Sequence, residues 1–429
     1  MKYADGSIGR CRSIVQTIRL MQKVSRANRA AGSLAVVALG GGLCLPFAGR
    51  ADEGDVVNYS FGVTKQRDDN LFRLPDGIDP LALTGKSARA DTITTATLGI
   101  GFKKAWSLQQ VEASYEHVDN RYATYGYLDN EADNARAAWR WQFTPRLKGN
   151  LTYDRSQALV SFGDFTDYGT KNVRTNTALR FDADWNLFGN GWHLQAGVGR
   201  HRASNSQLFV QDEGSRVASA DFGLRYVFPS GNWIGVVARD GEGEFIGRRL
   251  DVVNQLDTGF RDRRHELRAY WSRGKTLLEG SLGQASRDHD HFSSRDYRGG
   301  IGSLKWTWTP TGKLALLASW KRDFAAYTDA TSSYYRQDIV SIGPVWQVDA
   351  RLRLSLRLDH SRRDYRGAVT PLPFVARDDR GNSAQFSVDW SPLRSLTVAG
   401  YYIDDRRDSS RAGSDYAARI LGLSLRFEL

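Results

Sequence analysis

The last residues of the chain alternate strictly between apolar and polar side chains. Leu421, Leu423, Leu425, Phe427 and Leu429 take one phase, and Gly422, Ser424, Arg426 and Glu428 take the other. Because successive side chains of a β-strand point to opposite faces, this period predicts a strand with one apolar and one polar face.

The same period recurs between residues 351 and 359. Four leucines occupy the even positions, and Arg351, Arg353, Arg357 and Asp359 lie on the odd ones. Such a strand fits a soluble sheet poorly, since its apolar face needs a core and its charged face needs water. A barrel in lipid satisfies both faces, with leucine outside and a wet lumen inside. We therefore predict an all-β fold: a transmembrane, antiparallel, up-and-down β-barrel.

Turn signals predict the number of strands. From Val56 onward the chain divides into about 18 amphipathic segments. Short turns are expected at 144–146, 188–191, 229–232, 272–275, 310–313, 348–350 and 391–394, and longer polar loops at 65–90, 119–134, 156–172, 203–215, 241–260 and 365–380. Short turns on one side and long loops on the other are typical of bacterial outer-membrane barrels, so we expect the outer membrane of a Gram-negative cell.

The N-terminus predicts export. Residues 1–51 combine a basic segment, the apolar stretch 30–47 and small residues near 49–51, which together indicate a cleaved signal peptide. Met21 is an alternative translation start that gives a signal of ordinary proportions. The barrel is expected to occupy 52–429. A retained membrane helix is disfavoured because glycines and a proline interrupt the apolar stretch.

Removal of this segment changes the charge and the chemistry of the chain. Residues 1–51 carry eight Lys/Arg and one Asp, which leaves 51 basic and 47 acidic residues in 52–429. Without a basic block, nucleic-acid binding loses its main support. Both cysteines also lie in the removed segment, so the mature chain has no thiol for a disulfide or a metal.

Tryptophans gather near the predicted short turns. Tryptophan in membrane proteins collects at the headgroup level, so we interpret them as an aromatic girdle on the periplasmic side. The candidates are Trp139, Trp141, Trp185, Trp192, Trp306, Trp308 and Trp390. A soluble β-propeller, or a protein that stacks sugars on tryptophan, is the competing interpretation.

The polar phase of the strands predicts which side chains line the lumen. Arg or Lys rings bias a wide pore toward anions, although the charges could instead simply pair across strands. The candidates are Arg136, Arg140, Arg180, Arg225, Arg268, Lys305, Lys321, Arg351, Arg353, Arg357, Arg426, Asp182, Asp359 and Asp389. No motif for catalysis, a metal or a cofactor accompanies them, and we predict a protein that is not an enzyme.

Several segments resemble the exosortase-B-associated outer-membrane family of exopolysaccharide biosynthesis, called EpsL. The resemblance spans the mature chain and rests on residues 59–63, 68–73, Asp91, 139–141, 296–299, 304–311, 364–367 and the C-terminal strand. Many barrels end in an aromatic residue, whereas here Glu428 and Leu429 follow Phe427. The resemblance implies a barrel that carries polysaccharide across the outer membrane, and it supplies no functional residues.

The leading functional hypothesis is a non-enzymatic channel for exopolysaccharide export. Its partners would be the exopolysaccharide, periplasmic and inner-membrane export machinery, and outer-membrane lipid, with no nucleic acid. A general anion-leaning diffusion porin is the first alternative, with the loop 65–90 as its constriction. A barrel enzyme that acts on polymer or lipid is the second alternative.

Overall fold

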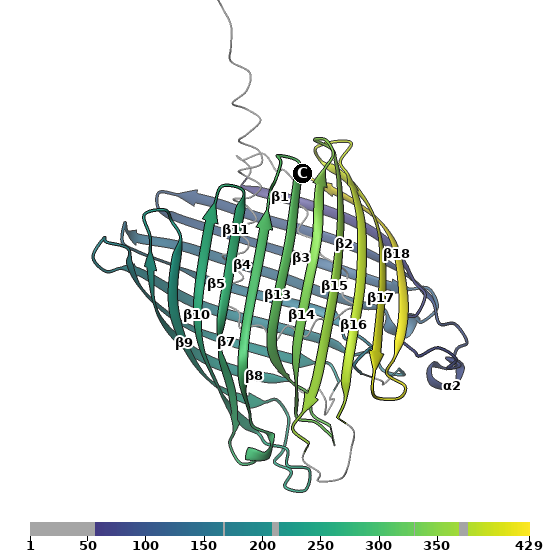
Figure 1. The fold of residues 1–429 in the computed structure, drawn as a ribbon. Coiled ribbons are helices and arrows are strands. Elements are labelled where there is room, and N and C mark those ends of the chain that lie inside the picture. The colour runs from purple at the N-terminus through teal and green to yellow at the C-terminus, as the bar shows by residue number, and fades with distance from the viewer. Residues whose placement is uncertain (1–55, 166–167, 208–213, 330, 369–375) are drawn as a thin grey trace, which may run out of the picture.

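The computed structural model describes residues 56–165, 168–207, 214–329, 331–368 and 376–429. The predicted signal peptide 1–51, its alternative start Met21 and the predicted cleavage site lie outside these residues. In the described part, 18 antiparallel strands form one closed sheet (Figure 1). The prediction of an up-and-down barrel of about 18 strands is confirmed.

Each strand pairs with its neighbours in the chain. The strands are β1 (Val57–Asp68), β2 (Asp91–Trp106), β3 (Gln109–Tyr122), β4 (Asn130–Thr144), β5 (Leu147–Leu159), β6 (Val173–Asn186), β7 (Trp192–Asn205), β8 (Ser215–Val227), β9 (Trp233–Phe245), β10 (Gly259–Arg273), β11 (Thr276–His289), β12 (Tyr297–Trp308), β13 (Leu314–Ala326), β14 (Tyr334–Gln347), β15 (Leu352–Arg366), β16 (Asp378–Trp390), β17 (Leu396–Ser409) and β18 (Tyr416–Glu428). Within the described ranges, three short helices lie in loops: α2 (Leu81–Thr84), η1 (Gly126–Leu128) and η2 (Ser293–Arg295). Among the described residues, no helix is long and apolar enough to cross a membrane.

The barrel closes between its first and last strands. β1 and β18 pair from Ser60 opposite Glu428 to Asp68 opposite Ile420. Beyond this ladder, Tyr59 and Leu429 exchange two backbone hydrogen bonds of 2.9 Å. The C-terminus therefore lies at the end of the barrel that carries the short turns, at the top of Figure 1.

An apolar belt surrounds the barrel. On most strands, four successive outward positions next to the short turns are apolar, and many of them are exposed, such as Leu98, Val198, Phe222 and Leu423. At the rise and tilt of barrel strands these positions cover roughly 20 Å, close to the lipid-facing band of outer-membrane barrels.

The strands continue beyond this belt, which corrects the predicted loop bounds. Of the loop predicted at 119–134, only 123–129 lies outside β3 and β4, and of the loop at 241–260, only 246–258 lies outside β9 and β10. The outward residues there are charged rather than apolar, so the alternation that marks a strand in sequence disappears while the backbone pairing persists. An eighth short turn, which the sequence analysis did not single out, lies at Ser107-Leu108 between β2 and β3.

One seam in the wall is paired over only part of its length. β12 pairs with β13 from Gly302 opposite Arg322 to Trp308 opposite Leu316, whereas the first five residues of β12 pair with β11 alone. Phe324 packs into this seam against Tyr297. A Cβ atom on Gly299 would lie 2.4 Å from the Phe324 ring, so glycine is needed there.

Candidate pore and its outer mouth

The barrel encloses a cavity of about 860 Å³. Its lining comes from β1 to β13 and from β16 to β18, and it contains six inward arginines and four carboxylates. The charged residues on inward faces are Arg136, Arg180, Arg239, Arg264, Arg287 and Arg426, against Glu116, Asp154, Asp262 and Asp389. A charge excess of this sign attracts anions into a water-filled pore.

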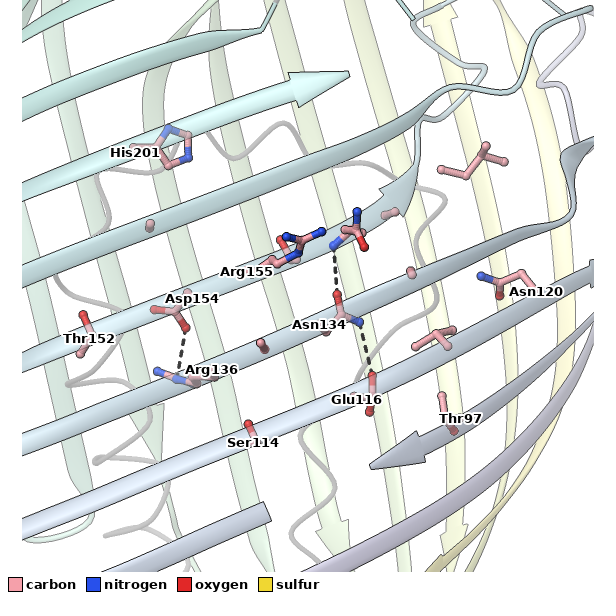
Figure 2. A pocket seen from close by; sticks show the side chains of 18 of the residues that line it. Thr97, Ser114, Glu116, Asn120, Asn134, Arg136, Thr152, Asp154, Arg155 and His201 are labelled. Carbon is pink, nitrogen blue, oxygen red and sulfur yellow. Dashed lines mark hydrogen bonds and ion pairs between the residues drawn. The ribbon is translucent and has the colours of Figure 1, made fainter. Parts of the chain in front are cut away.

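Hydroxyl and amide groups line the cavity wall formed by β1 to β5. Figure 2 shows Thr97, Ser114, Asn120, Asn134 and Thr152 on this wall. Some of these side chains also bind neighbouring ones: the Thr95 hydroxyl donates a hydrogen bond of 2.8 Å to the Asn120 amide oxygen. Side chains with both donors and acceptors suit a solute rich in hydroxyl groups.

Most of the predicted lumen residues lie on inward faces, where each basic group contacts a carboxylate. Figure 2 shows one such pair, Arg136 and Asp154 at 3.3 Å. The other pairs are Arg140–Glu112 at 2.6 Å, Arg180–Asp221 at 2.6 Å, Arg225–Asp184 at 2.5 Å, Arg268–Glu266 at 2.8 Å, Lys321–Asp323 at 3.6 Å, Arg353–Asp389 at 2.8 Å, Arg357–Asp359 at 2.8 Å and Arg426–Glu428 at 2.7 Å. Asp182 accepts a hydrogen bond of 3.0 Å from Asn150. The pairs put the wall's charges in fixed positions.

Two predicted lumen residues differ from this pattern. Arg351 lies in the turn before β15, where its backbone N–H donates to Asp349, so it is outside the barrel wall. The alternation of charged residues and leucines continues into this turn, which is why the sequence analysis assigned Arg351 to the strand. Lys305 lies opposite Glu279 in the ladder of β11 and β12.

The predicted girdle tryptophans all lie in the strand ends next to the short turns. Trp139, Trp185, Trp192, Trp308 and Trp390 are exposed on the outer face. Trp306 stacks beside Trp308, and Trp141 is covered because its ring stacks on Phe181.

The opposite end of the lumen is crossed by residues 160–165, which follow β5. Asp164 accepts hydrogen bonds of 2.8 Å from both Arg363 on β15 and Arg407 on β17. These strands lie at least six positions away from β5 around the barrel. The side chains of the three residues are only 9 to 16% exposed. Asp164 therefore connects opposite sides of the outer mouth.

The pKa of Asp164 reflects this position. Burial raises the pKa of a carboxyl group, but the two guanidinium groups lower it more, and the net pKa lies below the usual value. The carboxylate stays ionised wherever the outer surface of a cell is near neutral. In sequence, Asp164 is one of two aspartates in the loop predicted at 156–172, and no local signal distinguishes it.

An aromatic cluster supports the crossing segment. Phe162 packs against Phe72, and Tyr125 meets the same ring edge-on at 4.7 Å. Phe72 belongs to the loop 65–90, which we expected to form the constriction. That loop is instead held to its own side, because Asn70 donates to the backbone of Ala417 on β18. The segment that reaches the far wall is 160–165, which corrects the predicted constriction.

The histidines of the loop 290–296 and its flanks have aspartate partners. His291 bonds to the buried carboxylate of Asp257 at 2.9 Å, and His289 to Asp296 at 3.2 Å. No group of three or more metal-binding side chains occurs in the described ranges.

A closed antiparallel barrel with an apolar belt, short turns at one end and long loops at the other is an outer-membrane β-barrel. The chain is porin-like: the family model described as "Putative beta-barrel porin 2" matches residues 277–429, which correspond to β11 to β18.

Similar solved structures include outer-membrane proteins of Pseudomonas aeruginosa. OpdK has 11% sequence identity over 87% of this chain and 99% of its own, with a TM-score of 0.47. OccK9 (OpdG) has 14% identity over 87% and 98%, also with a TM-score of 0.47. The siderophore receptor PirA has 9% identity over 88% and 81%, with a TM-score of 0.42. No curated protein matches the sequence.

Proposed function

We propose that this barrel is a diffusion porin that favours small, hydrophilic, anionic solutes. The observation that carries the proposal is the cavity lining, which combines an excess of arginine with hydroxyl and amide groups. Fixed guanidinium groups attract anions, and the neutral polar wall exchanges hydrogen bonds with a hydrated solute.

The crossing segment supports a small solute rather than a long polymer. Asp164 joins residues 160–165 to the far wall, so the outer mouth is divided by a backbone held on both sides. A solute of sugar size needs only part of such a mouth, whereas a polymer needs a continuous wide path. This difference makes the porin the better supported function.

Polysaccharide export remains the second candidate. The row of hydroxyl and amide groups on β1 to β5 is chemically suited to sugars, and the sequence resembles the EpsL family. Export would require the segment 160–165 to move aside. It would also require periplasmic and inner-membrane partners that deliver the polymer.

Planar-bilayer recordings and liposome swelling test the proposal. The protein, purified from outer membranes, should give a steady conductance whose reversal potential in a KCl gradient has the sign of chloride preference. Liposomes that contain it should swell faster in gluconate than in glucose, since the two solutes are similar in size and differ in charge. Cation preference, or equal rates for both solutes, would contradict an anion-leaning porin.

Polymer fragments from the producing strain separate the two candidates. If the protein exports polymer, fragments added on the short-turn side should block the current in a concentration-dependent way. A conductance that ignores the fragments while it passes gluconate would support the porin and remove export.

A further inference from the structure

The charged outward residues beyond the apolar belt are unevenly distributed around the barrel. On β13 to β18 and β1 they are nine basic and five acidic: Arg322, Arg336, Arg362, Arg366, Arg380, Arg406, Arg419, Lys65 and Arg67, against Asp338, Asp364, Asp378, Asp404 and Asp408. On β2 to β12 they nearly balance, with eight basic and seven acidic: Arg121, Arg155, Arg200, Arg202, Arg216, Arg261, Arg263 and Arg298, against Asp119, Glu131, Asp133, Asp240, Glu242, Glu244 and Asp288.

Within the basic sector, single carboxylates are shared by two guanidinium groups. Asp378 lies 2.8 Å from Arg362 and 3.6 Å from Arg380. Asp404 lies 2.7 Å from Arg406 and 3.6 Å from Arg419. Asp408 lies opposite Arg380 in the ladder of β16 and β17 and beside Arg406, so the two triads and Asp408 together keep one net positive charge.

A third triad has the same arrangement. Asp364 lies 3.3 Å from Arg336 and 2.5 Å from Arg366. The three triads span adjacent strands from β14 to β18. We call them together the arginine patch.

The balanced sector uses its arginines differently. Arg216 pairs with Glu244 at 2.8 Å, Arg263 with Asp288 at 3.0 Å, and Arg261 with Asp240. Each of these three arginines thus has a carboxylate of its own, whereas in the arginine patch two arginines share one carboxylate.

The height of the arginine patch points to its ligand. On β15 to β18 the belt ends at Leu358, Ala384, Tyr402 and Leu421, and the patch begins within the next two outward positions. Side chains directly above the belt meet the headgroups of the outer leaflet. Arginine is suited to phosphate, which accepts bidentate hydrogen bonds from a guanidinium group. Basic residues near a membrane surface contribute about 1 kcal/mol each to the attraction of anionic lipid.

We infer that the arginine patch binds the phosphate groups of a phosphorylated glycolipid of the outer leaflet. The four arginines of the Asp378 and Asp404 triads are 52 to 65% exposed, so a phosphate reaches their free N–H donors without displacing packed side chains. Bound lipid would hold one sector of the outer rim in a fixed lipid contact, on the side opposite to β5 to β9.

Binding of diphosphoryl lipid A to the detergent-purified full chain tests the inference by native mass spectrometry. The patch variant carries Arg362→Gln, Arg380→Gln, Arg406→Gln and Arg419→Gln. The matched control carries Arg121→Gln, Arg216→Gln, Arg261→Gln and Arg263→Gln, which lie beyond the belt on β3, β8 and β10, are 40 to 57% exposed and pair with single carboxylates or with acidic neighbours.

The patch variant should lose at least about tenfold in affinity, and the control should stay within about twofold of the wild type. Fully dephosphorylated lipid A should bind all three proteins equally weakly. Equal losses in both variants, no loss in the patch variant, or binding that ignores the phosphates would each overturn the inference. If the fourfold patch variant does not fold, as judged by heat-modifiable migration on gels, the two double variants of single triads replace it.

Discussion

Replacement of Asp164 tests whether its carboxylate holds residues 160–165 across the outer mouth. In Asp164→Asn the shape of the side chain is kept, but the charge that faces Arg363 and Arg407 is lost. At an effective dielectric constant of about 20, each pair at roughly 4 Å between charge centres is worth about 4 kcal/mol before desolvation is subtracted. Because both guanidinium groups are nearly buried, the net cost of removing their partner should be about 3–5 kcal/mol.

This cost should appear as release of the crossing segment rather than as unfolding of the barrel. Residues 160–165 can leave the far wall and become solvated without breaking the strand pairing of the barrel. The population of this released state should therefore rise by roughly 150- to 5,000-fold. Single-channel recordings should then give a larger mean conductance with longer open periods. Thermal unfolding of the barrel itself should change little.

Asp251→Asn is the control, since Asp251 lies in an outer loop and its side chain bonds only within that loop. Lowering the pH should imitate Asp164→Asn in the wild type, but only below the ordinary carboxyl range, because the folded pKa of Asp164 is lowered. An Asp164→Asn channel with wild-type conductance, in a protein that still folds, would refute the view that this carboxylate holds the mouth.

Three further outcomes are expected. Asp389→Asn should free Arg353 and shift the reversal potential toward chloride, while Arg353→Gln should shift it toward potassium, because the pair contributes both signs at one place in the wall. Gly299→Ala should destabilise the barrel by about 1–3 kcal/mol in urea titrations, since the new methyl group meets the ring that fills the β12–β13 seam. Gly400→Ala, which meets no atom within 4 Å, should be near neutral. Finally, the pKa of His291 is raised by its contact with the buried Asp257 carboxylate. The stabilisation from this contact is complete below the pKa of His291 in the unfolded chain and is lost as the pH rises through its pKa in the folded protein. Protease should therefore cleave the outer loops faster at pH 8.5 than at pH 5.5, and His291→Ala should remove the difference.

The strands were predictable because their signal is local. Alternation at 352–358 and at 421–429 identified both the strand and its lipid face, since lipid on one side and water on the other impose opposite chemistry on neighbouring residues. The same signal failed above the belt, where outward residues such as Arg121 and Glu244 are charged, so that these strand ends resemble loops in composition.

The outer mouth was not predictable because its contacts are not local. Asp164 finds its partners 199 and 243 residues later in the chain, and neither arginine differs in sequence from those that simply line the wall. The loop 65–90 attracted attention by its length, but the hydrogen bonds that hold it to its own side come from the backbone of β18. The pairing of the lumen charges likewise depends on register across strands, which composition does not encode.

The closure of β1 on β18 has a consequence for how the barrel is made. Thr64 on β1 bonds to Ser424 on β18, a partner 360 residues later in the chain. Until that partner arrives, β1 has one open edge, and an open edge recruits any strand that is near. A cell that exports this chain must therefore keep its first hairpin from pairing wrongly for as long as the rest is delivered. Insertion and closure then become one event, completed by the last strand.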